Sequence, residues 1–146
     1  WNLSKDMLVE EFVPGRELTV AVMGGKALGV TEITTSLEFY DSEAKYAQGG
    51  SRHTLPAKIA HNVAHEALQL AEHAHAALGC RGVSRTDLRY DDTQAASGGK
   101  HRLILLETNT QPGMTKTSLV PEQAAYAGFS YGALCRWIVE DASCDR

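Results

Sequence analysis

Two apolar segments on either side of a glycine-rich turn restrict the fold of this chain more than any other feature. Residues 81–90 and 101–110 have the composition of strands, and residues 97–99 (Ser-Gly-Gly) favour a reversal of the chain. An antiparallel hairpin centred near residue 97 places Asp87 opposite Glu107, because 97 is the mean of the two positions. The sequence therefore predicts a sheet built around this hairpin.

One face of the predicted hairpin is strongly polar. Strand side chains alternate between faces, so Arg85 and Asp87 share a face of the first strand, and Glu107 and Asn109 share a face of the second. Carboxylates that face each other across a ladder repel, and such a pair usually needs a cation between them. Carboxylate and amide oxygens favour magnesium or manganese over zinc. The pattern thus predicts an oxygen-lined metal site.

Two alternatives remain open for this polar cluster. Hydrated charges at strand ends would need no metal, but the apolar run 103–106 leads directly into Glu107, and burying an unpaired carboxylate is costly. A bound cation would offset that cost. Arg85 either neutralises Asp87 or binds a phosphate or oxyanion, and its spacing favours neither role over the other.

Length and charge limit the class of protein. A chain of 146 residues with 43% hydrophobic content is sufficient for one domain with its own core. A net charge of −4, with no basic run among aromatics, argues against nucleic acid as a partner. No apolar stretch is long enough to cross a membrane, and the first residues lack a signal-peptide pattern, so we expect a cytoplasmic protein. Cys80, Cys135 and Cys144 lie far apart without a CxxC pair, which predicts free thiols.

The remaining elements predict an α+β fold, a mainly antiparallel sheet with flanking helices. The polar segment 36–53 lacks regular periodicity, and long loops of this kind often serve as functional lids. Further strands are predicted over residues 7–13, 17–23 and 27–33, a long helix over residues 56–78 that ends at Gly79, and closing helices over residues 121–126 and 131–139.

Two further segments allow a functional and a structural interpretation. The segment 110–115 after the second hairpin strand, which contains Gly113, is either only a turn or a loop whose backbone N–H groups face whatever the metal holds. Ser118 precedes a helix and is either an ordinary cap or part of an anion site. His61 and His65 have metal-ligand spacing, but Asn62 replaces the glutamate of HExxH, so we expect both at the surface.

Four motifs in order make the chain recognisable. They read EEFVPGRE (10–17), FYDSEAKY (39–46), GCRGVSRTD (79–87) and ETNTQPGMT (107–115), and SLVP (118–121) follows them. Together they resemble D-alanine–D-alanine ligase, an ATP-grasp family, over essentially the whole chain. The match is to the C-terminal part of that family only.

The resemblance implies a fold, a reaction and partners. Residues 1–146 would form the C-terminal lobe of an ATP-grasp domain in a larger ligase, with the N-terminal domain absent. That enzyme would join two D-alanines for peptidoglycan precursors through an acyl phosphate, using ATP and two Mg²⁺ or Mn²⁺ ions. The resemblance also allows a homodimer of the full-length enzyme. Because half of each substrate's contacts are missing, we expect the chain alone to be inactive.

The resemblance also implies roles for individual residues in binding the nucleotide. Glu11 departs from the family pattern, since relatives often carry lysine there; the departure is tolerable if backbone atoms make the contact. Backbone groups of the first motif would receive adenine, a glutamate would bind the ribose, and the second motif would supply a lid. The implied nucleotide-binding residues are Glu10, Glu11, Phe12, Val13, Glu17, Tyr40 and Lys45.

Roles in the reaction itself follow from the same resemblance. Tyr46 belongs to the lid and favours the dipeptide over D-alanyl-D-lactate. The implied metal ligands are Asp87, Glu107 and Asn109, the implied oxyanion donors are Arg85 and the N–H of Gly113, and the implied seat of the second carboxylate is Ser118 and Leu119. A D-alanine–D-lactate or other ATP-grasp ligase, and a non-catalytic nucleotide- or metal-binding fragment, are the alternatives.

Overall fold

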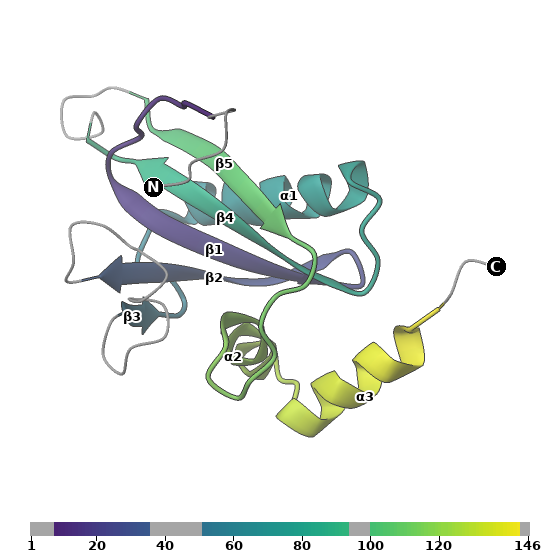
Figure 1. The fold of residues 1–146 in the computed structure, drawn as a ribbon. Coiled ribbons are helices and arrows are strands. Elements are labelled where there is room, and N and C mark those ends of the chain that lie inside the picture. The colour runs from purple at the N-terminus through teal and green to yellow at the C-terminus, as the bar shows by residue number, and fades with distance from the viewer. Residues whose placement is uncertain (1–7, 36–50, 94–99, 144–146) are drawn as a thin grey trace, which may run out of the picture.

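A computed structural model describes residues 8–35, 51–93 and 100–143 of the chain. This part forms a five-stranded, fully antiparallel sheet in the order β3-β2-β1-β4-β5, with three helices against it (Figure 1). The elements are β1 (Arg16–Met23), β2 (Lys26–Thr35), β3 (Ser51–Thr54), α1 (His61–Ala77), β4 (Val83–Asp91), β5 (Arg102–Asn109), α2 (Leu119–Tyr126) and α3 (Tyr131–Asp141).

Helix α1 covers one face of the sheet, which we call the α1 face (Figure 1). Alternate residues of β1 point into this interface, as the period of a strand requires, and α1 contributes residues four apart. The result is a largely apolar core. Its buried members are Leu18, Val20, Val22, Val30, Val63, Ala67, Ala71, Leu88 and Tyr90.

Helices α2 and α3 pack against one end of the opposite face, which we call the open face. A second, smaller cluster joins them to β1 and β4 through Ala21, Met23, Val83, Val120, Ala124 and Leu134. Gln123 of α2 is fully buried there: its Oε1 accepts from the N–H of Ala21 at 2.7 Å, and its Nε2 donates to the carbonyl of Thr19 and the hydroxyl of Thr31. This side chain fixes α2 to β1 and β2.

Three elements differ from the expectation. Strand β3 (Ser51–Thr54) begins inside segment 36–53, for which no regular element was expected, because it pairs with β2 at the edge of the sheet. Residues 8–13 form no strand, because β1 already has β2 and β4 as neighbours and Pro14 then Gly15, at φ +94°, turn the chain into it. The long helix begins at His61 rather than at residue 56, because the preceding segment is held to the sheet by a hydrogen bond from Ala57 N–H to the carbonyl of Val30. Its end is confirmed, with Gly79 in the left-handed region.

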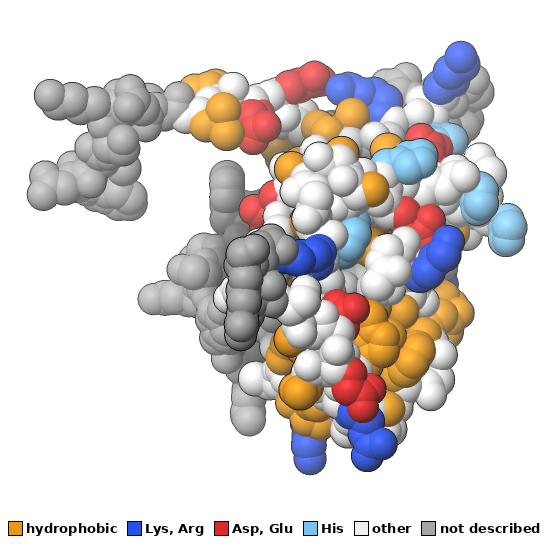
Figure 2. Space-filling model, turned by 90° about the vertical axis from the view of Figure 1, so that its right-hand side faces the viewer, with side chains coloured by type: hydrophobic (Ala, Val, Ile, Leu, Met, Phe, Trp, Pro, Cys, Tyr) orange, Lys and Arg blue, Asp and Glu red, His pale blue; other side chains and the backbone are white. Residues whose placement is uncertain are grey.

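Cysteines, helix length and histidine exposure can be stated for the described residues, outside which Cys144 lies. Cys80 and Cys135 are free thiols. No helix in this part of the chain has the length and apolar character needed to cross a membrane. His61 and His65 are exposed, as expected, and histidine side chains gather on the surface shown in Figure 2.

Candidate active site

The β4–β5 hairpin brings the predicted charges together on the open face. Asp87 lies directly opposite Glu107, and Arg85 lies opposite Asn109, which confirms the expected pairing. The pairing depends on an irregularity in the ladder: nearer the turn, Tyr90 pairs with Leu103, and continuing that register would place an apolar residue against Asp87. A bulge after Asp87 adds one residue to β5 and brings Glu107 into place.

Asp87 is held by two neighbours on this face. Arg85 donates from Nε to Oδ1 at 2.9 Å and from Nη2 to Oδ2 at 2.7 Å, and the Thr19 hydroxyl donates to Oδ1 at 2.6 Å. The side chains of Arg85 and Asp87 are only 15% and 14% exposed, so water screens the pair poorly. In this structure, therefore, Arg85 neutralises Asp87, and its expected role toward a phosphate or oxyanion stays a prediction.

Glu107 and Asn109 lie on an edge strand with little cover. Glu107 is exposed and makes no hydrogen bond or ion pair within the described residues, and its neighbours Leu105 and Leu106 are 37% and 49% exposed. The expectation that an apolar run would bury Glu107 is therefore wrong for the described part of the chain, in which this end of β5 stays exposed. The Asn109 Oδ1 accepts from the N–H of Gln111 at 2.9 Å.

The donor atoms of Asp87, Glu107 and Asn109 are of the type that a hard cation prefers. Two facing carboxylates and a neighbouring amide provide oxygen ligands, which magnesium and manganese prefer. Within the described residues no group of three or more His, Cys, Asp or Glu side chains gathers in a metal-binding arrangement. A cation here would thus rest on Asp87, Glu107 and Asn109, and Asp87 would share its oxygens with Arg85.

The loop after β5 carries the next two predicted residues side by side. A Cβ placed on Gly113 would lie 3.0 Å from the Ser118 Oγ, so the two positions are in close contact. Ser118 is the N-cap of α2, yet its side chain makes no cap bond; its Oγ accepts from Thr115 N–H at 3.1 Å. The ordinary-cap interpretation of the hydroxyl is therefore not what the structure shows. Leu119 is the first residue of α2.

Residues 8–15 form an extended segment across the end of β4 and β5, which we call the linker. Arg89 of β4 donates to the carbonyls of Val13 and Gly15 at 3.1 and 3.0 Å. Glu11 forms a forked ion pair with Arg102 of β5, at 3.0 and 3.2 Å, and the hydrogen bond from Arg102 lowers the pKa of the Glu11 carboxyl. In this structure, therefore, the Glu11 side chain binds β5.

Several predicted residues are not brought together by the described part of the chain. Tyr40, Lys45 and Tyr46 lie outside the described residues. Glu17 lies in β1 directly across from Arg89, two positions along the same face from Thr19. Glu10 and Phe12 lie in the exposed linker, where the Phe12 side chain is 81% exposed, whereas Val13 is buried.

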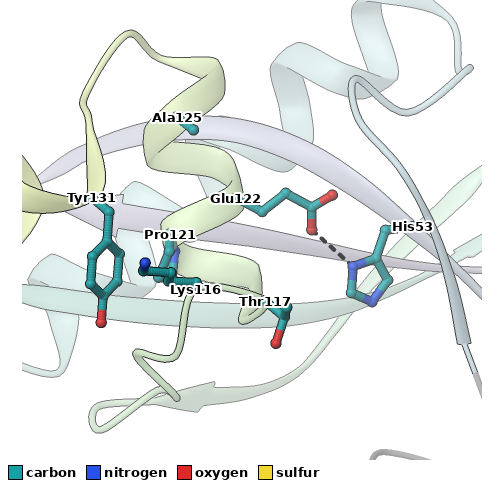
Figure 3. A pocket seen from close by; sticks show the side chains of 7 residues that line it. All are labelled: His53, Lys116, Thr117, Pro121, Glu122, Ala125 and Tyr131. Atoms are coloured by element: carbon teal, nitrogen blue, oxygen red, sulfur yellow. Dashed lines mark hydrogen bonds and ion pairs between the residues drawn. The ribbon is translucent and has the colours of Figure 1, made fainter. Parts of the chain in front are cut away.

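The structure also shows residues that the sequence analysis missed. A cavity of about 500 Å³ beside α2 is lined by His53, Lys116, Thr117, Pro121, Glu122, Ala125 and Tyr131 (Figure 3). In it, the His53 ring nitrogen lies 2.8 Å from a Glu122 oxygen, joining β3 to α2. Arg89 could have been found from its same-face spacing with Arg85 and Asp87, whereas nothing local marked Gln123 as a tertiary contact.

Comparison with known proteins gives consistent matches. The family model described as "D-ala D-ala ligase C-terminus" matches residues 2–140. A "D-alanine--D-alanine ligase" of Paramagnetospirillum magneticum is 62% identical over 146 residues, which are 99% of this chain and 47% of that protein. This chain therefore spans about half the length of the curated relatives it matches.

Solved structures share the fold. A D-alanine--D-alanine ligase from Bacillus anthracis complexed with ATP has a TM-score of 0.72 and 25% identity, over 90% of this chain and 39% of that one. The VanG D-Ala:D-Ser ligase from Enterococcus faecalis also has a TM-score of 0.72, with 28% identity over 89% of this chain and 37% of that one. The expectation of an α+β lobe of the ATP-grasp type is confirmed.

Proposed function

Because the chain belongs to the D-ala D-ala ligase C-terminus family, we propose that it is the C-terminal lobe of an ATP-dependent ligase that joins two D-alanines. The observation that carries the proposal is the facing pair of Asp87 and Glu107 with Arg85 beside them, on a sheet face that α1 leaves uncovered. The high identity to a relative named as this ligase supports the substrate class.

In this proposal the nucleotide lies against the open face. Backbone groups of residues 10–13 receive the adenine, and Glu17 binds the ribose hydroxyls. The facing oxygen donors Asp87, Glu107 and Asn109 hold Mg²⁺ or Mn²⁺, which neutralises the charge on the phosphates when it is bound. The lid residues Tyr40, Lys45 and Tyr46, outside the described part, complete the phosphate end of the site.

The chemistry proceeds in two transfers. A carboxylate oxygen of the first D-alanine takes the γ-phosphoryl group from ATP, which releases ADP and leaves an acyl phosphate. The amine of the second D-alanine then attacks the acyl carbon, loses a proton, and expels phosphate. Arg85 and the N–H of Gly113 stabilise the oxyanion of the second step, in which one such donor contributes roughly 3 kcal/mol.

The second D-alanine is oriented by the loop before α2. The Ser118 hydroxyl and the first N–H groups of α2, starting at Leu119, receive its carboxylate, since a helix N-terminus attracts anions. The dipeptide serves peptidoglycan precursors, and the use of ATP places the reaction in the cytoplasm. Small molecules are then the partners of this site.

The test is turnover by the full-length protein with ATP and D-alanine. We expect ADP release together with D-alanyl-D-alanine, detected by mass spectrometry, and much less product when D-serine or D-lactate replaces the second D-alanine. The isolated 146-residue chain should release no ADP above background, because it contains only part of each substrate site. Absence of dipeptide from the full-length protein, or full turnover by the isolated chain, would contradict the proposal.

A further inference from the structure

The linker is held in place by side chains rather than by a ladder. Residues 8–14 belong to no strand, and three of their apolar side chains, Leu8, Val9 and Phe12, are more than four-fifths exposed. A segment this exposed has few packing contacts of its own to define its path. Apart from the buried side chain of Val13, its position therefore depends on the groups that bind its backbone.

Arg89 provides the polar anchor closest to β1. Its Nε donates to the carbonyl of Val13 at 3.1 Å and its Nη2 donates to the carbonyl of Gly15 at 3.0 Å, so one planar fork spans two carbonyls of the linker. The linker also approaches β4 closely at Gly15, where a Cβ would lie 2.2 Å from the carbonyl oxygen of Tyr90. Only glycine allows the backbone to come within reach of the guanidinium on this path.

The location of Arg89 connects the linker with the polar cluster. Arg89 lies two positions from Asp87 on the open face of β4 and pairs directly with Glu17 of β1. The residues proposed for adenine, ribose and metal thus flank a single arginine side chain. With the Val13 carbonyl occupied by Arg89, the other backbone groups of residues 10–13 remain for the nucleotide base.

We infer that Arg89 is a positioning residue of the nucleotide site, which fixes the backbone of the linker so that its remaining polar groups meet the adenine in one orientation. The inference rests on the proposed function of the linker. Arg89 acts through the Val13 and Gly15 peptides and need not touch the nucleotide. Arg102 also holds the linker, through Glu11, but it binds a side chain rather than the backbone.

The test compares Arg89→Gln and Arg89→Lys with the wild type in the full-length protein. We expect Arg89→Gln to weaken ATP binding about tenfold by calorimetry without D-alanine, since two charge-assisted hydrogen bonds are lost, while the KM for D-alanine changes less than about twofold. Arg89→Lys should recover only part of the affinity, because an ammonium group cannot span both carbonyls. Without nucleotide, hydrogen exchange of the amides in residues 8–15 should accelerate in Arg89→Gln.

Arg16→Gln is the matched control. Arg16 likewise donates to a backbone carbonyl, that of Lys58, and it also binds the carboxylate of Glu32, but it lies beside Tyr90 on the α1 face. This variant should lose stability without a selective loss of ATP affinity. If Arg89→Gln binds ATP as tightly as the wild type, or if both variants weaken it equally, the inference is wrong.

The outcomes separate this inference from the proposed function. A wild-type protein that binds ATP but makes no dipeptide would overturn the proposed ligation, and the ATP affinities would still decide the role of Arg89. A wild-type protein that makes dipeptide while Arg89→Gln keeps its ATP affinity would overturn the inference alone. A wild-type protein that binds no ATP would overturn both.

Discussion

The two faces of the sheet differ in what holds them and in what they leave available. The α1 face is an apolar core in which Leu18 and Leu88 are fully buried. The open face carries a charged cluster held by hydrogen bonds, and its edge residue Glu107 is exposed. Neighbouring residues of one strand therefore face different surroundings: Leu88 is buried in the core and stabilises the fold, whereas we propose that Asp87 serves the chemistry.

The largest expected effect is a loss of activity when Asp87 of the open face is replaced. Asp87→Asn keeps the shape of the side chain but removes the charge that a cation needs, so we expect kcat/KM of the full-length protein to fall roughly a thousandfold, about 4 kcal/mol in barrier. Urea unfolding should change by no more than about 2 kcal/mol, because the amide oxygen still accepts from Arg85 and Thr19. Asp92→Asn, just beyond β4, is the control and should leave activity unchanged. If the activity of Asp87→Asn stays within a few fold of wild type, the proposal that the open face carries the chemistry is wrong.

The adjacent residue tests the other face. Leu88→Ala should lower the free energy of unfolding by about 3 kcal/mol, because it removes a fully buried side chain and leaves a cavity beneath α1. Leu106→Ala, at a side chain that is 49% exposed, should cost less than about 1 kcal/mol. Both are measured by urea denaturation. Equal losses would mean that the α1 face is not the main source of stability.

A variant of Gln123 tests what holds α2 against the open face. Gln123→Leu leaves the N–H of Ala21 and the carbonyl of Thr19 without their partner, so we expect a loss of about 2 kcal/mol in thermal or urea unfolding. Gln69→Leu, at an exposed position of α1, should change stability by less than about 0.5 kcal/mol. A Gln123 variant as stable as wild type would show that packing alone holds α2.

The smallest expected effect is a pH dependence of the α1 face. Burial lowers the pKa of His75, which is 5% exposed and hydrogen-bonds with Ser84. The unfolded chain, with a pKa near 6.5 for this group, therefore binds the proton more readily than the folded chain. The contribution to stability is complete above about pH 6.5 and is lost as the pH falls toward the folded pKa.

The measurement is urea unfolding between about pH 5 and about pH 8. The wild type should lose stability toward the acidic end, and His75→Gln should show a smaller slope. His65→Gln, at an exposed position of the same helix, should keep the wild-type slope. A wild-type slope in the His75 variant would contradict the assignment.

The pairing of the hairpin was predictable because it depends on local signals. Apolar runs on both sides of a glycine-rich turn favour antiparallel strands, and the two-residue period puts Arg85 and Asp87 on one face. The mean of the two positions pointed to the right partners, although the bulge after Asp87 is what brings them together. Sequence alone does not reveal such a bulge, since its position depends on packing of the whole sheet.

Other features were beyond local reasoning. Residues 8–13 have a strand-like composition, but β1 has no free edge for them to join, and the arginine side chains of β4 and β5 hold them instead. In the sequence, Gln123 resembles an ordinary polar residue of a helix. Its hydrogen bond to Ala21 forms only because α2 packs against β1. In both places, contacts between residues far apart in the chain override local propensity.

The sequence by itself determined the α+β class, the family and the charged pair of the hairpin, because periodicity, turns and motifs depend on residues that are close together in the chain. The structure adds two local contacts that the pattern left open, Arg85 with Asp87 and the Ser118 hydroxyl with Thr115. Only the tertiary structure decided that Arg89 holds the linker. The contact of Arg89 with Val13 and Gly15 depends on which groups folding brings together, because no local pattern in the sequence specifies a partner so far away in the chain.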